Sequence, residues 1–148
     1  MRQENMDTDM IAAAANGSLD DVRRCAELSV DLNAEDCCGW TPLHWAAWNG
    51  HIAIMEFLVS HCANANASDK FGNIPLHWAA IHDNTEVIEF LVSVGADVNS
   101  VNRGGETPLH WATKSGHVRV AELLVSKGAV IRVVDVRQAF RQEQLRPG

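Results

Sequence analysis

Apolar and polar positions along the chain repeat with a fixed period. The stretch "TPLHWAAWNGH" at residues 41–51 returns as "IPLHWAAIHDN" at 74–84 and "TPLHWATKSGH" at 107–117, each time 33 residues later. An apolar segment follows each one, namely "IMEFLV", "VIEFLV" and "VAELLV". A repeat of this kind indicates stacked supersecondary units rather than one globular core, because each unit buries its apolar faces only against its neighbours.

Each unit is predicted to contain two short helices and a turn. Thr41 and Thr107 suit the cap of the first helix, and the proline after each threonine suits the first helical position, where its missing N–H would have no partner. Ile74 stands at the equivalent place and lacks the hydroxyl cap. Small alanines in the first helix allow close approach, while the second helix supplies larger apolar side chains. The units are expected at about residues 8–40, 41–73, 74–106 and 107–135, the first being degenerate.

Length and charge narrow the class of protein. The chain has 148 residues, the usual size of one domain, and a net charge of −7. Residues 136–148 carry three arginines and one glutamate, so the preceding part has a net charge of −9. An acidic body argues against a nucleic-acid partner, which requires a basic face. We expect residues 1–7 to be disordered, 8–135 to form the repeat domain, and 136–148 to form a C-terminal cap that frays at its end.

The recurring "TPLHWAAWNGH", the "GADVN" turn and the "GGETPLH" lead-in resemble the ankyrin repeat, whose signature is Thr-Pro-Leu-His-x-Ala. The resemblance covers about Thr8 to Asp135 and is weakest in the first unit, which lacks this block. It implies an all-α solenoid of paired antiparallel helices with projecting β-hairpin turns. It also implies a scaffold or adaptor that is a monomer when unbound and binds another protein through its concave groove and turns. The alternative is a stoichiometric inhibitor of a kinase or transcription factor.

Candidate reactive groups do not converge in this sequence, so no enzyme, cofactor or metal site is expected. His44, His77 and His110 recur once per unit, and their expected role is to bond the neighbouring turn through the ring nitrogens. The cysteines lack zinc-ribbon spacing, and no segment resembles a secretory signal or a membrane span. We therefore expect reduced thiols, no membrane insertion, and a cytoplasmic or nuclear location.

Tryptophan gives the sharpest signal for binding. At about 100° per residue, with Leu43 in the core, Trp45 and Trp48 point away from that core. In a solenoid the first helix lines the concave groove, so the equivalent Trp45, Trp78 and Trp111 are expected to form a ladder that suits a binding hot spot. The alternative, which stays open at this point, is that the rings cover the joints between adjacent repeats.

Further contact candidates are positions that vary between units while the framework stays constant. They lie at the turn tips and after the Ala-Ala or Ala-Thr pairs, and they comprise Cys37, Cys38, Trp40, Trp48, Asn49, Lys70, Phe71, Asn73, Ile81, His82, Arg103, Glu106, Lys114 and Ser115. A redox or metal role is the alternative for the adjacent cysteines.

Asn99 carries a separate signal. Its context "LVSVGADVN" resembles the acceptor pattern of the asparaginyl hydroxylase that modifies ankyrin domains in animals. The competing interpretation is a turn residue held by bonds between side chain and backbone.

The C-terminal end raises a packing problem. The last repeat's second helix, "VRVAELLV", is no more polar than the internal ones, so its outer face needs a cover. We expect the tail to fold back and bury its apolar residues, namely Val130, Ile131, Val133, Val134, Val136 and Phe140, while Pro147 and Gly148 fray. Alternatively, the chain is a fragment of a longer array.

Overall fold

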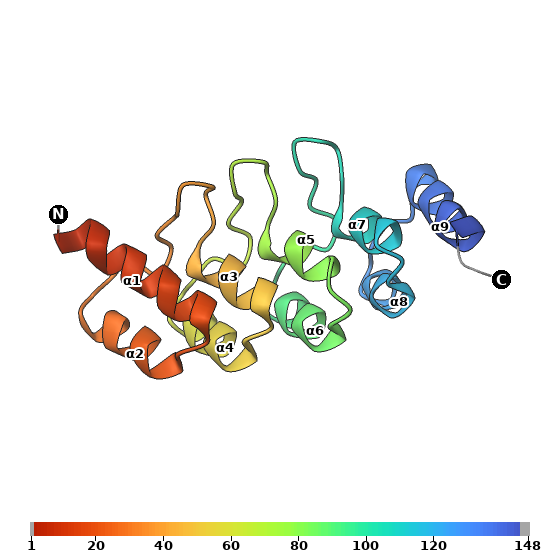
Figure 1. Ribbon diagram of the computed structural model, residues 1–148. Helices are drawn as coiled ribbons and strands as arrows, with labels where there is room; N and C mark the ends of the chain where they lie inside the picture. Colours follow the sequence, from red (N-terminus) through yellow and green to blue (C-terminus); the bar gives the residue numbers. More distant parts are fainter. Residues whose placement is uncertain (1, 146–148) are drawn as a thin grey trace.

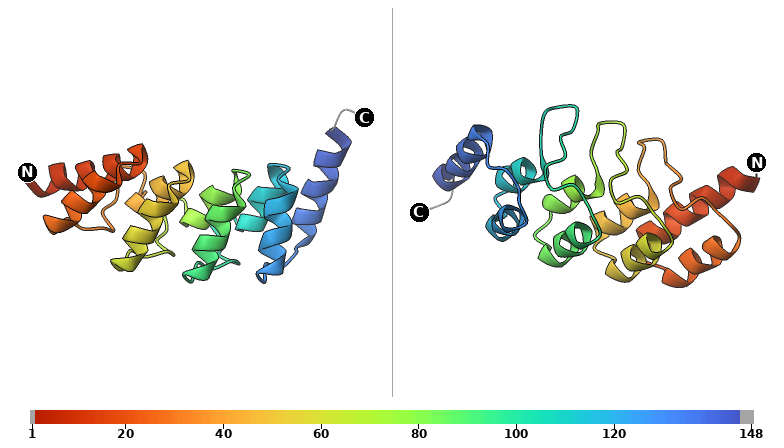
Figure 2. Two further views of the ribbon diagram at one scale, coloured as in Figure 1. Left: turned by 90° about the horizontal axis from the view of Figure 1, so that it is seen from below. Right: turned by 180° about the vertical axis from the view of Figure 1, so that it is seen from behind.

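The computed structural model describes residues 2–145, and these form a row of stacked helix pairs (Figure 1). In chain order the helices are α1 (Arg2–Asn16), α2 (Leu19–Glu27), α3 (Pro42–Asn49), α4 (Ile52–Ser60), α5 (Pro75–Ala80), α6 (Thr85–Ser93), α7 (Pro108–Lys114), α8 (Val118–Ser126) and α9 (Val133–Leu145). The first helix of each pair lies in one layer and the second in another, as the views in Figure 2 show. No strand forms within residues 2–145, so the expected all-α solenoid is confirmed.

The first helices begin where the sequence predicts. Thr41 caps α3 through its side-chain oxygen, which accepts from the N–H of His44, and Pro42 occupies the first turn. α5 begins at Pro75 without a hydroxyl cap, because Ile74 stands in place of threonine. Gly50 ends α3 in the left-handed conformation, with φ of 74°.

Three long loops, here called fingers, connect α2 to α3, α4 to α5 and α6 to α7, and they project from the same side of the row (Figure 1). Neighbouring fingers touch through their backbones: the N–H of Lys70 donates to the carbonyl of Cys38 at 3.1 Å, and that of Arg103 donates to Phe71 at 3.0 Å. Gly39 makes this approach feasible, because a Cβ there would lie 2.9 Å from the nitrogen of Lys70. Neighbouring fingers are therefore stacked on one another and joined at their tips by backbone hydrogen bonds.

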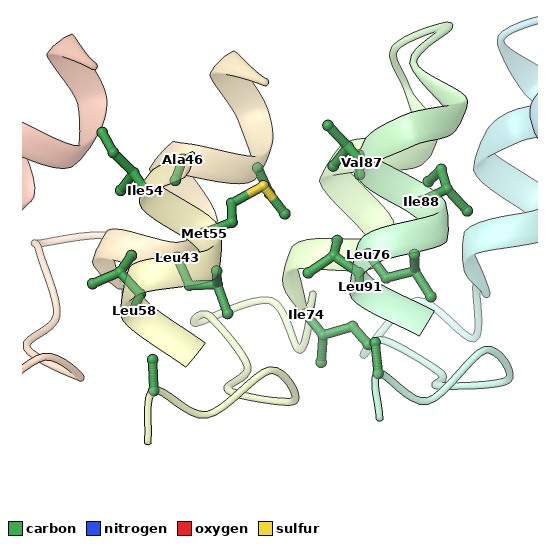
Figure 3. Packing of buried hydrophobic residues seen from close by; sticks show 14 of the residues in the cluster. Leu43, Ala46, Ile54, Met55, Leu58, Ile74, Leu76, Val87, Ile88 and Leu91 are labelled. Carbon is green, nitrogen blue, oxygen red and sulfur yellow. The ribbon is translucent and has the colours of Figure 1, made fainter. Parts of the chain in front are cut away.

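The core runs continuously between the two helix layers. Leu43 and Ala46 of α3 face Ile54, Met55 and Leu58 of α4, and all are buried (Figure 3). The next repeat places its own leucines and valines at the equivalent positions beside them. None of the helices among residues 2–145 combines the length and apolar character that crossing a bilayer requires.

The N-terminal segment differs from the expectation of disorder over residues 1–7. Helix α1 begins at Arg2 and packs against both α2 and α3. Met10 is fully buried, and Met6 packs against the core as well. The repeat register begins near Thr8 and gave no reason to extend the helix toward the N-terminus. The packing of Met6 and Met10 against the core holds this longer helix in place. Met1 lies outside the described residues.

The C-terminal segment forms α9, which begins before the expected boundary at residue 136 and packs against α7. The expectation that its apolar residues would be buried is wrong. The exposed fractions are 62% for Val130, 57% for Ile131, 71% for Val133, 40% for Val134, 59% for Val136 and 62% for Phe140. The inner face of α9 carries Asp135, Gln138 and Gln142 instead, at helical spacing. Pro147 and Gly148, which were expected to fray, lie outside the described residues.

Candidate protein-binding face

His44 joins two repeats from inside the framework. Its Nδ1 accepts from the N–H of Thr41 at 3.1 Å, and its Nε2–H donates to the carbonyl of Asn73 in the next repeat at 3.0 Å. Burial lowers the pKa of His44, in keeping with the neutral ring that accepts at Nδ1. His77 repeats the arrangement with the N–H of Ile74 and the carbonyl of Glu106, and burial lowers its pKa too. The predicted framework role of these two histidines is confirmed.

His110 has a different environment, because no finger follows the fourth repeat. Its Nε2 lies 3.2 Å from a carboxylate oxygen of Glu106, and its Nδ1 lies 3.4 Å from one of Asp135. Asp135 also accepts from the N–H of Arg132 at 2.8 Å. Across residues 2–145, no group of three or more His, Cys, Asp and Glu side chains is arranged to hold a metal ion.

The three repeated tryptophans are tied to the fingers by their indole N–H groups. Each donates to a carboxylate in the preceding finger: Trp45 to Asp36 at 3.0 Å, Trp78 to Asp69 at 2.9 Å, and Trp111 to Glu106. In Glu106, burial raises the pKa, but the hydrogen bonds from Trp111 and Asn102 and the nearby charges of His110 and Lys114 together bring it below its ordinary value. The sequence pattern gave no sign of these bonds, because donor and acceptor lie nine residues apart in the first two cases.

The tryptophan rings also contact one another along the row of first helices. We call this surface the aromatic row and define it as Trp40, Trp45, Trp48, Trp78, His82 and Trp111. Centroid distances along it are 4.7 Å for Trp40–Trp45, 4.8 Å for Trp40–Trp78, 5.7 Å for Trp48–Trp78, 4.3 Å for Trp48–His82 and 5.0 Å for Trp78–Trp111. The row therefore runs without a break across the first helices of the last three repeats, with Trp40 of the first finger packed against it.

Trp40 is the centre of the aromatic row, which the sequence pattern did not indicate. It contacts Trp45, Trp48 and Trp78 and stacks on His44 at 5.9 Å. Asparagine and glutamate stand at the equivalent position in the later repeats, so the sequence marks Trp40 only as a variable residue.

Every ring of the aromatic row is half-buried. Contacts such as Trp40–Trp78 and Trp78–Trp111 cross repeat boundaries, so the rings do cover the joints between repeats. Each ring also keeps part of its surface open to solvent. The rings therefore cover the joints between repeats, and binding of a partner through their open parts stays a prediction.

The finger tips present most of the remaining candidates to solvent. Cys37, Cys38, Lys70 and Arg103 are exposed, and Phe71 is 64% exposed although it is a large apolar residue. The sulfur atoms of Cys37 and Cys38 lie 4.0 Å apart. The neighbouring Cys37 thiol raises the pKa of Cys38, which disfavours the reactive thiolate.

Asn73 is the clearest correction among the predicted contact residues, because it is only 3% exposed. Its side-chain oxygen accepts from the amide of Asn102 at 2.8 Å, its carbonyl accepts from His44, and its N–H donates to Asp69. Its side-chain oxygen, its carbonyl and its N–H are therefore all used inside the framework. Variation between repeats was the reason for proposing it, but here that variation reflects different internal partners.

Glu106 and the candidates that follow the alanine pairs are divided between surface and framework. Asn49, Lys114 and Ser115 are exposed, whereas Ile81, His82 and Glu106 are half-buried. The side chain of Asn49 donates to the carbonyl of Ala15 in the first repeat, at 3.1 Å. Among them, His82 belongs to the aromatic row, and the others add no reactive group to it.

Asn99 is tied to the following segment by both ends of its carboxamide. Its nitrogen donates to the carbonyl of Gly128 at 3.1 Å, and its oxygen accepts from the N–H of Val130 at 2.8 Å. Asn66 does the same one repeat earlier, with Gly95 and Asp97. The turn-residue interpretation accounts for Asn99, and its hydroxylation stays a prediction.

A second open surface lies between α8 and α9. This apolar groove of about 690 Å³ is lined by residues that include Leu109, Val118, Ala121, Val136 and Phe140. In the internal repeats the positions equivalent to Ala121 are fully buried by the following pair of helices. The groove therefore marks the place where α9 covers α7 but leaves α8 open.

Stacked helix pairs, fingers joined through their backbones and an aromatic surface on one layer define a helical repeat protein of the interaction class. The family model described as "Ankyrin repeats (3 copies)" matches residues 2–69 and 61–135. The chain therefore belongs to the ankyrin repeat family. Ankyrin repeats are generally protein–protein interaction modules, and the fold itself is non-catalytic.

Similar stretches occur in proteins of diverse organisms and names. The chain is 42% identical over 48 residues to acyl-CoA-binding domain-containing protein 1 of Arabidopsis thaliana, which is 32% of this chain and 14% of that protein. It is 39% identical over 57 residues to osteoclast-stimulating factor 1 of Danio rerio, 38% of this chain and 27% of the relative. It is 41% identical over 59 residues to ankyrin repeat domain-containing protein 63 of Homo sapiens, 40% of this chain and 16% of the relative. The chain thus matches only a small part of each relative's length.

Proposed function

We propose that this chain is a scaffold or adaptor that binds a partner protein across the aromatic row and the finger tips. The observation that carries the proposal is the unbroken run of half-buried indole rings over three repeats. Tryptophan is enriched in binding hot spots, since it offers a large apolar area and loses little conformational entropy on binding.

The finger tips extend this surface. Phe71 lies at the tip of the second finger and is 64% exposed, so burial of its ring contributes little to the stability of the chain. Exposed apolar area beside a row of aromatic rings is typical of a surface that a partner covers. The backbone bonds between fingers hold Phe71 in place, so little ordering is required on binding.

Affinity capture with the immobilised chain tests the proposal. A specific partner identified by mass spectrometry should lose affinity for the Phe71→Ala variant, by about ten-fold or more if the ring is a hot spot. Leu28→Ala is the matched control, because Leu28 is similarly exposed at 60% but is the C-cap residue of α2 and does not lie at a finger tip. Equal loss with both variants, or with neither, would contradict docking at the finger tips.

The inhibitor alternative is separated from the adaptor by one further measurement. An inhibitor suppresses the activity of the captured partner when the purified chain is added alone, at one-to-one stoichiometry. An adaptor leaves that activity unchanged and requires a second partner or domain.

A further inference from the structure

We infer that the aromatic row receives an organic cation, namely the ammonium or guanidinium group of a basic segment in the partner protein. This inference rests on the proposed function and names the chemistry of its partner. It is carried by the juxtaposition of three clustered indole rings with two carboxylates that form no ion pair within residues 2–145.

Three indole rings of the aromatic row form a compact cluster. The centroids of Trp40, Trp48 and Trp78 are 5.9, 5.7 and 4.8 Å apart, and the ring planes are inclined to one another by 63°, 81° and 50°. A triangle of this size is small enough for one cation above it to lie within about 6 Å of all three centroids. Indole has the strongest cation-binding face among the aromatic side chains.

The carboxylates strengthen the attraction. Asp36 and Asp69 accept from the indole N–H groups of Trp45 and Trp78, and their other oxygens accept only from backbone N–H groups of the same finger. Neither carboxylate has an ion pair within residues 2–145. Each therefore leaves a negative charge behind the row, and an N–H that donates to an anion makes its ring more electron-rich.

The histidines behind the row do not offset these charges, and the exposed Lys70 and Arg103 at the finger tips form no ion pair with Asp36 or Asp69. Burial lowers the pKa of His44 and His77, so the rings behind the row are neutral. Lys114 shares α7 with Trp111 and repels a cation at that end. The preferred place is consequently the cluster of Trp40, Trp48 and Trp78.

Choline and 3,3-dimethylbutan-1-ol provide the direct test, because they have the same shape and differ in charge. Each is titrated into the ¹⁵N-labelled chain at constant ionic strength while the indole N–H signals of Trp40, Trp48 and Trp78 are followed. Choline should bind with a dissociation constant about five-fold to thirty-fold lower than the neutral alcohol. Equal binding of the two probes, or the absence of binding by choline, would overturn the inference.

Variants localise the effect. Trp48 donates no hydrogen bond to the framework in the described residues, so Trp48→Leu removes a ring face with little structural change. It should abolish most of choline's advantage while the alcohol binds nearly as before. Phe57→Leu on α4 removes an aromatic ring outside the row and should change neither probe. If a captured partner loses affinity for Phe71→Ala but the probes show no charge preference, the proposed function stands and only the cationic chemistry fails.

Discussion

The Nε2–H of His44 donates to the main-chain carbonyl of Asn73 at 3.0 Å, across the boundary between two repeats. The same ring accepts the N–H of Thr41 at its other nitrogen. One neutral imidazole thus fixes the start of α3 and ties it to the following finger. His77 performs the same task one repeat later, so the framework depends on two uncharged histidines.

Stability should therefore fall in mild acid. Both histidines have a pKa below the ordinary 6.5 in the folded chain, so the unfolded chain takes up protons first as the pH falls. The free energy of unfolding is full above about pH 6.5. It decreases as the pH drops from there toward the lowered folded values, by up to about 1.4 kcal/mol per pH unit for each histidine. Urea titrations at about pH 7.5 and 5.5 measure this difference, and His77→Gln should roughly halve it. An equal free energy at both pH values would contradict the bonding assigned to the rings.

Asn33, Asn66 and Asn99 occupy equivalent positions in the turns after the second helices. Each should stabilise the folded chain in proportion to the number of hydrogen bonds that its side chain makes to the following repeat. Asn66→Ala and Asn99→Ala each remove two bonds to the next repeat, so each should lower the free energy of unfolding by about 1–2 kcal/mol. Asn33→Ala removes one such bond, from the N–H of Asn64, and should cost less. Chemical denaturation of the three variants gives the ranking, and a largest effect at Asn33 would disprove it.

Removal of most of α9, from Val136 onward, tests its role as a cover. A chain without residues 136–148 should melt a few degrees earlier, because α9 packs on α7, and about 1 kcal/mol shifts the Tm of a domain this size by roughly 2–4 °C. Phe140→Ser should leave the Tm unchanged, since the ring is 62% exposed. Differential scanning calorimetry distinguishes the cases. An unchanged Tm after the deletion would show that the part of α9 after Asp135 adds no stability.

The period of the sequence predicted the repeats well, because equivalent residues form the same local structures and core contacts in each repeat. The Thr-Pro helix start, the buried leucines and the left-handed glycines recur at fixed spacing, so one correct unit implies the others. The ends follow no such rule. Whether α1 extends to Arg2 depends on where Met6 and Met10 find cover, and the face of α9 that meets α7 depends on the buried Asp135.

The candidate site was predictable only in outline. Helical geometry placed the tryptophans away from the core, and they do form a continuous row. Variation between repeats selected exposed Phe71 correctly as a surface residue but also selected Asn73, which is buried. A variable position records a changed environment, and the sequence does not say whether that environment is solvent or another repeat.

Trp45 and Trp48 should respond differently to replacement by leucine, although they lie three residues apart on the same helix. The indole N–H of Trp45 donates to Asp36 at 3.0 Å, so Trp45→Leu leaves a carboxylate oxygen without its partner and should lower the free energy of unfolding by about 1–3 kcal/mol. Trp48 makes ring contacts alone, with Trp40, Trp78 and His82.

Trp48→Leu should therefore keep most of the stability, because leucine is a strong helix former and the core beneath is untouched. Its affinity for a captured partner should instead fall by roughly thirty-fold, the effect of a tryptophan hot spot of about 2 kcal/mol. Denaturation curves and binding isotherms of the two variants, measured side by side, separate support from recognition. If Trp48→Leu melts as early as Trp45→Leu and the folded fraction binds normally, the aromatic row serves packing only and the binding energy lies in the fingers.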